Sequence, residues 1–130
     1  MSQMSNQIIK SFIINASVPA YVIVCRAATT TAQVTDLWTA TSMIVGVTAD
    51  AGSTGDSIPV VIGGTAKVIC LTSISAGSIV GPGTGTGFGV ALGATFTSTA
   101  LFKHVGLALD QGSSNSVIEV LINVNNIAGA

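Results

Sequence analysis

The sequence predicts an all-β protein of short antiparallel strands, folded as a small β-barrel or β-sandwich with little or no helix. Ser, Thr, Gly and Val outnumber the good helix formers, and no apolar stripe with a helical period persists for three turns. Short runs rich in β-branched residues alternate with Gly, Ser, Asp and Asn, which are typical of turns. A repeated segment within the chain is the third observation that favours this fold class.

The repeated segment consists of residues 45–62 and 105–122, which align 60 positions apart without a gap. Each copy predicts an apolar strand, a polar turn that begins with Asp and Gly, and a second strand with alternating aliphatic residues. We therefore expect two similar hairpins, either as an internal repeat or as two hairpins that converged on similar turn residues. Eight of the 18 aligned pairs are identical: Val45/Val105, Gly46/Gly106, Asp50/Asp110, Gly52/Gly112, Ser53/Ser113, Ile58/Ile118, Val60/Val120 and Ile62/Ile122.

The second strand of each copy has a predicted inner face. Alternation places Ile58, Val60 and Ile62 on this face of the first copy, and the identical residues of the second copy on the same face. Pro59 and Glu119 then share an outward position. Because proline has no N–H to donate to a ladder, the flank beside Pro59 should be an edge or be covered by another part of the protein.

The remaining elements follow from the apolar runs between turn residues. Residues 1–7 are polar and are expected to form a flexible arm, while residues 8–130 form a single β domain that is large enough to bury its own core. A bend at 15–19 and a turn at Gly63 and Gly64 separate some of these runs. The strands expected beyond the two hairpins are 8–14, 21–26, 34–38 (as a strand or one short turn), 66–71, 79–80 and 90–92.

The glycine-rich segment 81–89 is interpreted as the tip of a hairpin. Its glycines alternate strictly, whereas a phosphate-binding loop needs GxGxxG or GxxxxGK[ST] spacing and a following helix. No lysine follows and no helix is expected. We therefore predict no phosphate site in this segment.

The low content of charged residues limits the possible functions. Charged residues make up 7% of the chain, against about 25% in typical domains, and the formal net charge is −1. Four basic residues cannot neutralise a nucleic-acid backbone, and no apolar run reaches the length of a membrane span. No targeting segment is expected at the start of the sequence. A surface so poor in charge suits a protein that is covered by partners, and Trp38 is expected to be a core or interface anchor.

Groups that could carry out catalysis or bind a metal are few and scattered. His104 is the only histidine, and it stands directly before a predicted strand, so an ordinary surface or strand-end role is expected. Asp50 and Asp56 flank a turn that resembles a weak calcium loop, but the second copy lacks one of the two carboxylates. Cys25 and Cys70 are expected to be reduced and buried. We expect no enzymatic activity, cofactor or metal.

Three segments resemble tailed-phage capsid decoration (head cement) proteins: SFIINASVPAYVIVCRA, VTDLWTATSMIVGVTADAGSTGDSIPVVIGG and SAGSIVGP…GFGVALG…HVGLALDQGSSNSVIEVLI. The likeness covers roughly residues 8–124 and rests on turn-and-strand patterns. It implies a small β-barrel or β-sandwich on the outer surface of the virion's capsid, which binds the major capsid protein and bridges capsomers. It also implies a homo-oligomer, often a trimer, with no nucleic-acid or membrane partner.

Candidate contact residues follow from the arm, the tryptophan and the glycine-rich tip. The arm is suited to β-augmentation when it orders on a partner. The candidates are Ser2, Gln3, Met4, Ser5, Asn6, Gln7, Trp38, Thr84, Thr86 and Phe88.

Three other functions stay open. A carbohydrate-binding or adhesin-like module would need Trp38 or Tyr21 to form an exposed aromatic platform. A tail or fibre subunit would have similar strands but would attach to another part of the particle. A small hydrolase would depend on His104.

Overall fold

The computed structural model describes residues 7–26, 33–35, 43–83, 87–91 and 104–125. These residues form an all-β fold, as the sequence predicts, and contain no helix that is long and apolar enough to cross a membrane. Their strands are β1 (Ile8–Ile13), β2 (Ile23–Arg26), β3 (Val34–Thr35), β4 (Ile44–Thr48), β5 (Ser57–Ile69), β6 (Ile79–Pro82), β7 (Gly89–Ala91), β8 (His104–Ala108) and β9 (Val117–Asn125).

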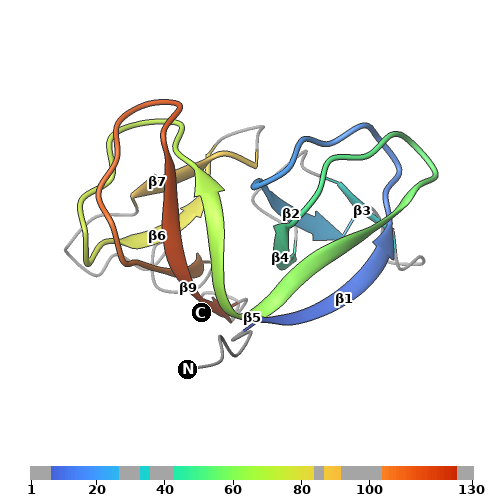
Figure 1. Cartoon of the computed structure of the whole chain (residues 1–130), viewed down its shortest axis with the longest axis horizontal. Helices are drawn as coiled ribbons and strands as arrows, with labels where there is room; N and C mark the ends of the chain where they lie inside the picture. Colours follow the sequence, from blue (N-terminus) through green and yellow to red (C-terminus); the bar gives the residue numbers. More distant parts are fainter. Residues whose placement is uncertain (1–6, 27–32, 36–42, 84–86, 92–103, 126–130) are drawn as a thin grey trace, which may run out of the picture.

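The strands form two lobes that share the long strand β5 (Figure 1). The strand order is β3-β2-β4-β5-β9-β8-β6-β7, and β1 pairs with the first part of β5. A parallel bridge from Ile14 to Val34 connects the two ends of the first set of strands, and a bridge from Cys70 to Gly89 does the same in the second. Each lobe is therefore a small curled barrel of five strands, which confirms the predicted fold class.

The expected turn at Gly63 and Gly64 is wrong, because β5 continues through both glycines. The ladder changes partner there: Gly63 lies opposite Ile8 in β1, and Gly64 lies opposite Ile122 in β9. Gly64 has a φ of 84°, which glycine adopts without steric cost. The two glycines thus bend a strand and pass it from one barrel to the next (Figure 1).

The repeated segments form two hairpins with the same register. Val47 lies opposite Val61 in the β4–β5 ladder, and Leu107 lies opposite Leu121 in the β8–β9 ladder, 60 positions later. Gly46 and Gly106 have the same role: a Cβ on either would collide with the backbone oxygen of Val61 or Leu121. The identical glycines therefore allow the close approach of the two strands in each hairpin.

The duplication extends well beyond the hairpins, to residues that show little identity. The Ile14 N–H donates to the Asp56 carbonyl oxygen (3.0 Å), and the Cys70 N–H donates to that of Ser116 (2.8 Å). In the same way, Val18 forms a bridge with Gly52, and its counterpart Ile74 forms a bridge with Gly112. Tyr21 and its counterpart Gly77 both have a positive φ. The described residues of 8–63 (the N-terminal half) and of 64–125 (the C-terminal half) thus form two copies of one unit, with an offset of 56 positions early in the unit and 60 positions late in it.

Two clusters of buried side chains form the core. One fills the N-terminal barrel, and the other fills the C-terminal barrel and continues onto the outer wall of the first. The predicted inner face holds for both strands except at Ile62, which is exposed, while its outward neighbour Val61 is buried. Val61 is buried because the second barrel covers the wall on which it lies.

Pro59 does not lie on an edge strand, because β5 runs between β1 and β4. Its carbonyl oxygen accepts the Ala49 N–H (3.0 Å), so its missing donor faces the β4 side, just past the last ladder pair of Thr48 and Val60. The missing N–H of Pro59 therefore lies beyond the end of the β4–β5 ladder, and it interrupts no pair of that ladder.

Candidate functional site

Most of the predicted contact residues lie outside the described part of the chain. These are Ser2, Gln3, Met4, Ser5, Asn6, Trp38, Thr84 and Thr86. The structure places the other two, Gln7 and Phe88, at the junction of the two barrels. Gln7 donates from Nε2 to the Thr65 carbonyl oxygen (3.0 Å), which holds Gln7 beside the bend of β5.

Phe88 is half-buried and packs against the core of the N-terminal half. The neighbouring Gly87 accepts the Ile23 N–H at its carbonyl oxygen (2.7 Å), and Gly83 donates to the Phe88 carbonyl oxygen (2.9 Å). The glycine-rich segment does connect a hairpin, β6–β7, as predicted. Gly87 and Phe88, at the end of this segment, also join the C-terminal half to the N-terminal half.

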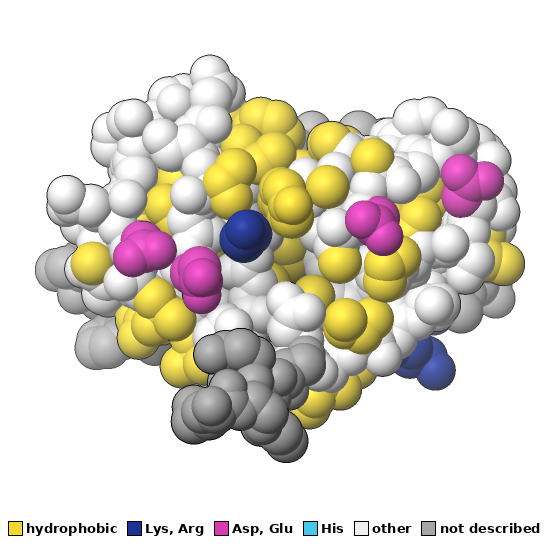
Figure 2. Space-filling view, viewed as in Figure 1, with side chains coloured by type: hydrophobic (Ala, Val, Ile, Leu, Met, Phe, Trp, Pro, Cys, Tyr) yellow, Lys and Arg dark blue, Asp and Glu magenta, His cyan; other side chains and the backbone are white. Residues whose placement is uncertain are grey.

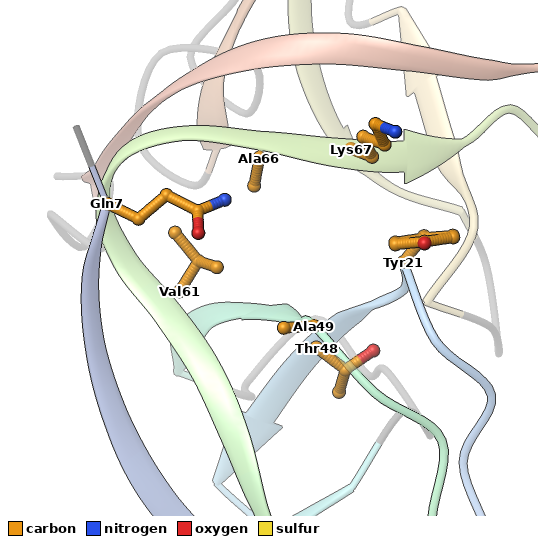
Figure 3. A pocket seen from close by; sticks show the side chains of 7 residues that line it. All are labelled: Gln7, Tyr21, Thr48, Ala49, Val61, Ala66 and Lys67. Atoms are coloured by element: carbon orange, nitrogen blue, oxygen red, sulfur yellow. The ribbon is translucent and has the colours of Figure 1, made fainter. Parts of the chain in front are cut away.

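A pocket of about 260 Å³ opens between the two halves, beside the bend of β5 (Figure 3). Its lining residues are Gln7, Tyr21, Thr48, Ala49, Val61, Ala66 and Lys67. Tyr21 has a left-handed φ of 65°, and its backbone joins both halves: its N–H donates to the Thr48 carbonyl oxygen, and its own carbonyl oxygen accepts the Ile69 N–H (both 2.9 Å). The Tyr21 side chain stands at the rim of this pocket (Figure 3).

The chemistry of the pocket suits weak polar contacts. The Thr48 hydroxyl already donates to the Pro19 carbonyl oxygen (2.8 Å), so it serves the fold. The other polar groups on the walls are the amine of Lys67, the phenol of Tyr21 and the amide of Gln7, which already donates to the Thr65 carbonyl oxygen. These groups include no carboxylate or imidazole that would pair with the amine for acid–base work.

The other reactive side chains lie apart from this pocket. His104 is the first residue of β8, as expected, and burial lowers its pKa; its Nδ1 is buried and contacts no hydrogen-bond partner in the described region. Cys25 and Cys70 are buried and reduced, as predicted, and burial raises the pKa of the Cys70 thiol. The carboxylate of Asp56 accepts the Ser53 N–H (2.9 Å) and so closes its own turn. Within the described ranges, no three His, Cys, Asp or Glu residues gather as a metal site.

Exposed aliphatic side chains form the other conspicuous feature of the surface. Figure 2 shows hydrophobic side chains spread over both lobes, with few charged ones among them. On the C-terminal half, Leu107, Leu109 and Leu121 lie exposed on β8, β9 and the adjoining turn. Sequence analysis did not identify this surface, because alternation alone does not say which outward positions another barrel will cover.

The fold defines a duplicated all-β protein made of two small barrels. Among solved structures, the chain is similar to the crystal structure of the head fiber gp8.5 N base in bacteriophage phi29, with a TM-score of 0.67 and 14% sequence identity. The likeness covers 94% of this chain and 98% of that one. At this identity it is a likeness of fold. No family model and no curated protein matches the sequence.

Proposed function

We propose that this chain is a structural, non-enzymatic protein of a phage head, which binds the outer surface of the assembled shell and stabilises it by bridging capsomers. The observation that carries the proposal is the agreement of nearly the whole fold with the base of a phage head fiber. The resemblance of the sequence to head cement proteins points to the same part of the particle by a separate route.

The physical properties of the chain support attachment by surface burial. Charged residues are scarce, and large aliphatic side chains remain exposed on the sheet. Such a surface gains free energy when a partner removes it from water, at about 25 cal/mol per Å² of apolar area. A homo-oligomer, which we propose to be a trimer, would engage several capsid contacts at once and so gain avidity.

A second candidate is the base of a head fibre, and the similarity to a fiber base favours it specifically. Both candidates bind the head from outside. They differ in what projects outward: a cement protein ends at the shell, whereas a fibre base carries further chain or a further protein. Electron micrographs of decorated heads distinguish a smooth knob from a filament.

Binding to heads tests the proposal. Purified chain is mixed with heads of the phage whose genome encodes it, and the bound fraction is measured after sedimentation. We expect saturable binding to heads and none to isolated tails. Binding to tails alone would contradict the proposal and favour a subunit of the tail or of a tail fibre.

The N-terminal arm can be tested in the same assay. Deletion of residues 1–6 keeps Gln7 and its bond to Thr65, so the fold should be retained. We expect a large fall in head occupancy, because we propose that the arm adds strand contacts to the shell. Full occupancy by the truncated chain would contradict the role of the arm.

A further inference from the structure

The two halves carry equivalent outer walls, of which only one is covered. In the N-terminal half this wall consists of Ile23, Ile44, Val47 and Val61, and we call it the covered wall. The duplication places Ile79, His104, Leu107 and Leu121 at the same positions of the C-terminal half, and we call these the open wall. The exposed fraction rises from 0% at Val47 to 38% at Leu107, and from 1% at Val61 to 43% at Leu121.

The C-terminal barrel supplies the surface that covers the first wall. Strands β8 and β9 contact β4, and Ala66, Val105 and Ile122 belong to the same buried cluster as the covered wall. We call these three residues the covering surface. Their counterparts in the N-terminal half are Lys10, Val45 and Ile62, and we call them the open seat.

The open seat shows the opposite mismatch of burial. Ile122 is 7% exposed whereas Ile62 is 37% exposed, and Lys10 is exposed where Ala66 is buried. In a two-fold arrangement, both halves would bury the same surface. Here the N-terminal half contributes the covered wall and the C-terminal half contributes the covering surface. The contact within the chain is therefore head-to-tail. It leaves the open wall of the C-terminal half and the open seat of the N-terminal half unused, at opposite ends of the molecule.

We propose that a second copy of this chain docks its open seat on the open wall and so repeats the contact between the two halves. The occupant follows from the duplication, because the N-terminal half is a copy of the unit that already covers such a wall. The chemistry of the open wall fits this occupant: Leu107 and Leu121 stand where Val47 and Val61 make the covered contact. A head-to-tail contact of this kind closes into a ring or extends as a filament.

Two positions of the proposed contact depart from the covered one. Lys10 stands where the covering surface has Ala66, and its aliphatic stem can lie on the wall while its amine stays at the rim. His104 stands where the covered wall has Ile44. If the inter-chain contact repeats the internal one, Lys10→Ala should strengthen association, because it makes the open seat more like the covering surface.

Cross-linking between two variants tests the polarity of the contact. One protein carries Ile62→Cys in the seat and the other carries Leu121→Cys in the wall. A short bismaleimide should link the mixture into a dimer that contains both variants, and should link neither variant to itself. Native Cys25 and Cys70 are buried and should not react, and Leu71→Cys, exposed but outside both surfaces, is the matched control.

The strength of the contact is measured by sedimentation equilibrium on the whole chain. We expect Leu107→Asp to weaken self-association at least tenfold and Lys10→Ala to strengthen it. Self-linking of Leu121→Cys would overturn the proposal in favour of a two-fold contact. An unchanged association constant for Leu107→Asp would also overturn it, and loss of head binding in that variant would then assign the wall to the capsid.

This inference names the self-contact of the oligomer in the proposed function, but it does not depend on head binding. Cross-linking and sedimentation use the isolated protein. A cross-linked oligomer that fails to bind heads would contradict only the proposed function. A monomer that decorates heads would contradict the head-to-tail contact and the proposed oligomer, but not the proposed binding to the head.

Discussion

A matched pair of substitutions tests whether the duplicated walls differ in burial as described. Val47→Asp and Leu107→Asp place the same charge at equivalent positions, opposite Val61 and Leu121 respectively. The Val47 side chain is fully buried in a cluster of hydrophobic side chains. The Leu107 side chain retains access to water. The two variants should therefore differ sharply in stability although the local sequence and register are alike.

The expected difference follows from the cost of a buried charge. An uncompensated carboxylate at position 47 should cost about 3–5 kcal/mol, whereas an exposed substitution at position 107 should cost less than about 1 kcal/mol. The unfolding entropy of 130 residues converts 1 kcal/mol into about 4 °C. We expect Val47→Asp to lower the Tm by about 12–20 °C, or to prevent folding, and Leu107→Asp to lower it by less than about 4 °C.

The measurement is thermal unfolding followed by circular dichroism at submicromolar concentration, so that self-association does not contribute. Val47→Ala serves as the milder variant, with an expected loss of about 2 kcal/mol if Val47→Asp fails to fold. Equal losses for the two Asp variants would refute the assignment of a covered and an open wall. So would a larger loss at position 107.

Further predictions concern the close glycines, the histidine and the thiols. Gly46→Ala and Gly106→Ala should each cost about 3 kcal/mol in urea unfolding, since both place a Cβ against a strand backbone; a loss below 1 kcal/mol would contradict the close approach. Because the pKa of His104 is lowered by folding, the unfolded chain binds more protons, and stability should fall as pH drops below the ordinary value of about 6.5. His104→Ile should reduce that loss between pH 8 and pH 5, and an unchanged pH profile would exclude the histidine as its cause. Cys25 and Cys70 should not react with a maleimide until the chain unfolds, whereas labelling of the native protein would contradict their burial.

The sequence was sufficient to predict the fold class and the two hairpins. Hairpin turns depend on local chemistry, so the Asp, Gly and alternating aliphatic residues within 45–62 and 105–122 are enough to predict these two hairpins. The buried cysteines and the β6–β7 hairpin at the glycine-rich segment were predicted for similar local reasons.

Long-range pairing explains what the sequence did not predict. The full duplication was missed because its early part is preserved in hydrogen bonds, such as those of Ile14 and Cys70, and hardly in identity. The two glycines at 63–64 indicated a turn, whereas the change of ladder partner from β1 to β9 keeps β5 continuous. The exposure of Ile62 and the burial of Val61 depend on the neighbouring barrel, which local alternation does not specify.

A map of heads from the encoding phage, obtained by cryo-electron microscopy with this protein bound, tests the central proposal most directly. We predict density of two small barrels per chain on the outer face of the shell, at its symmetry or quasi-symmetry axes and in contact with more than one capsomer. A shell that is bare on its outside, with the chain located on the tail or absent from the particle, would contradict the account.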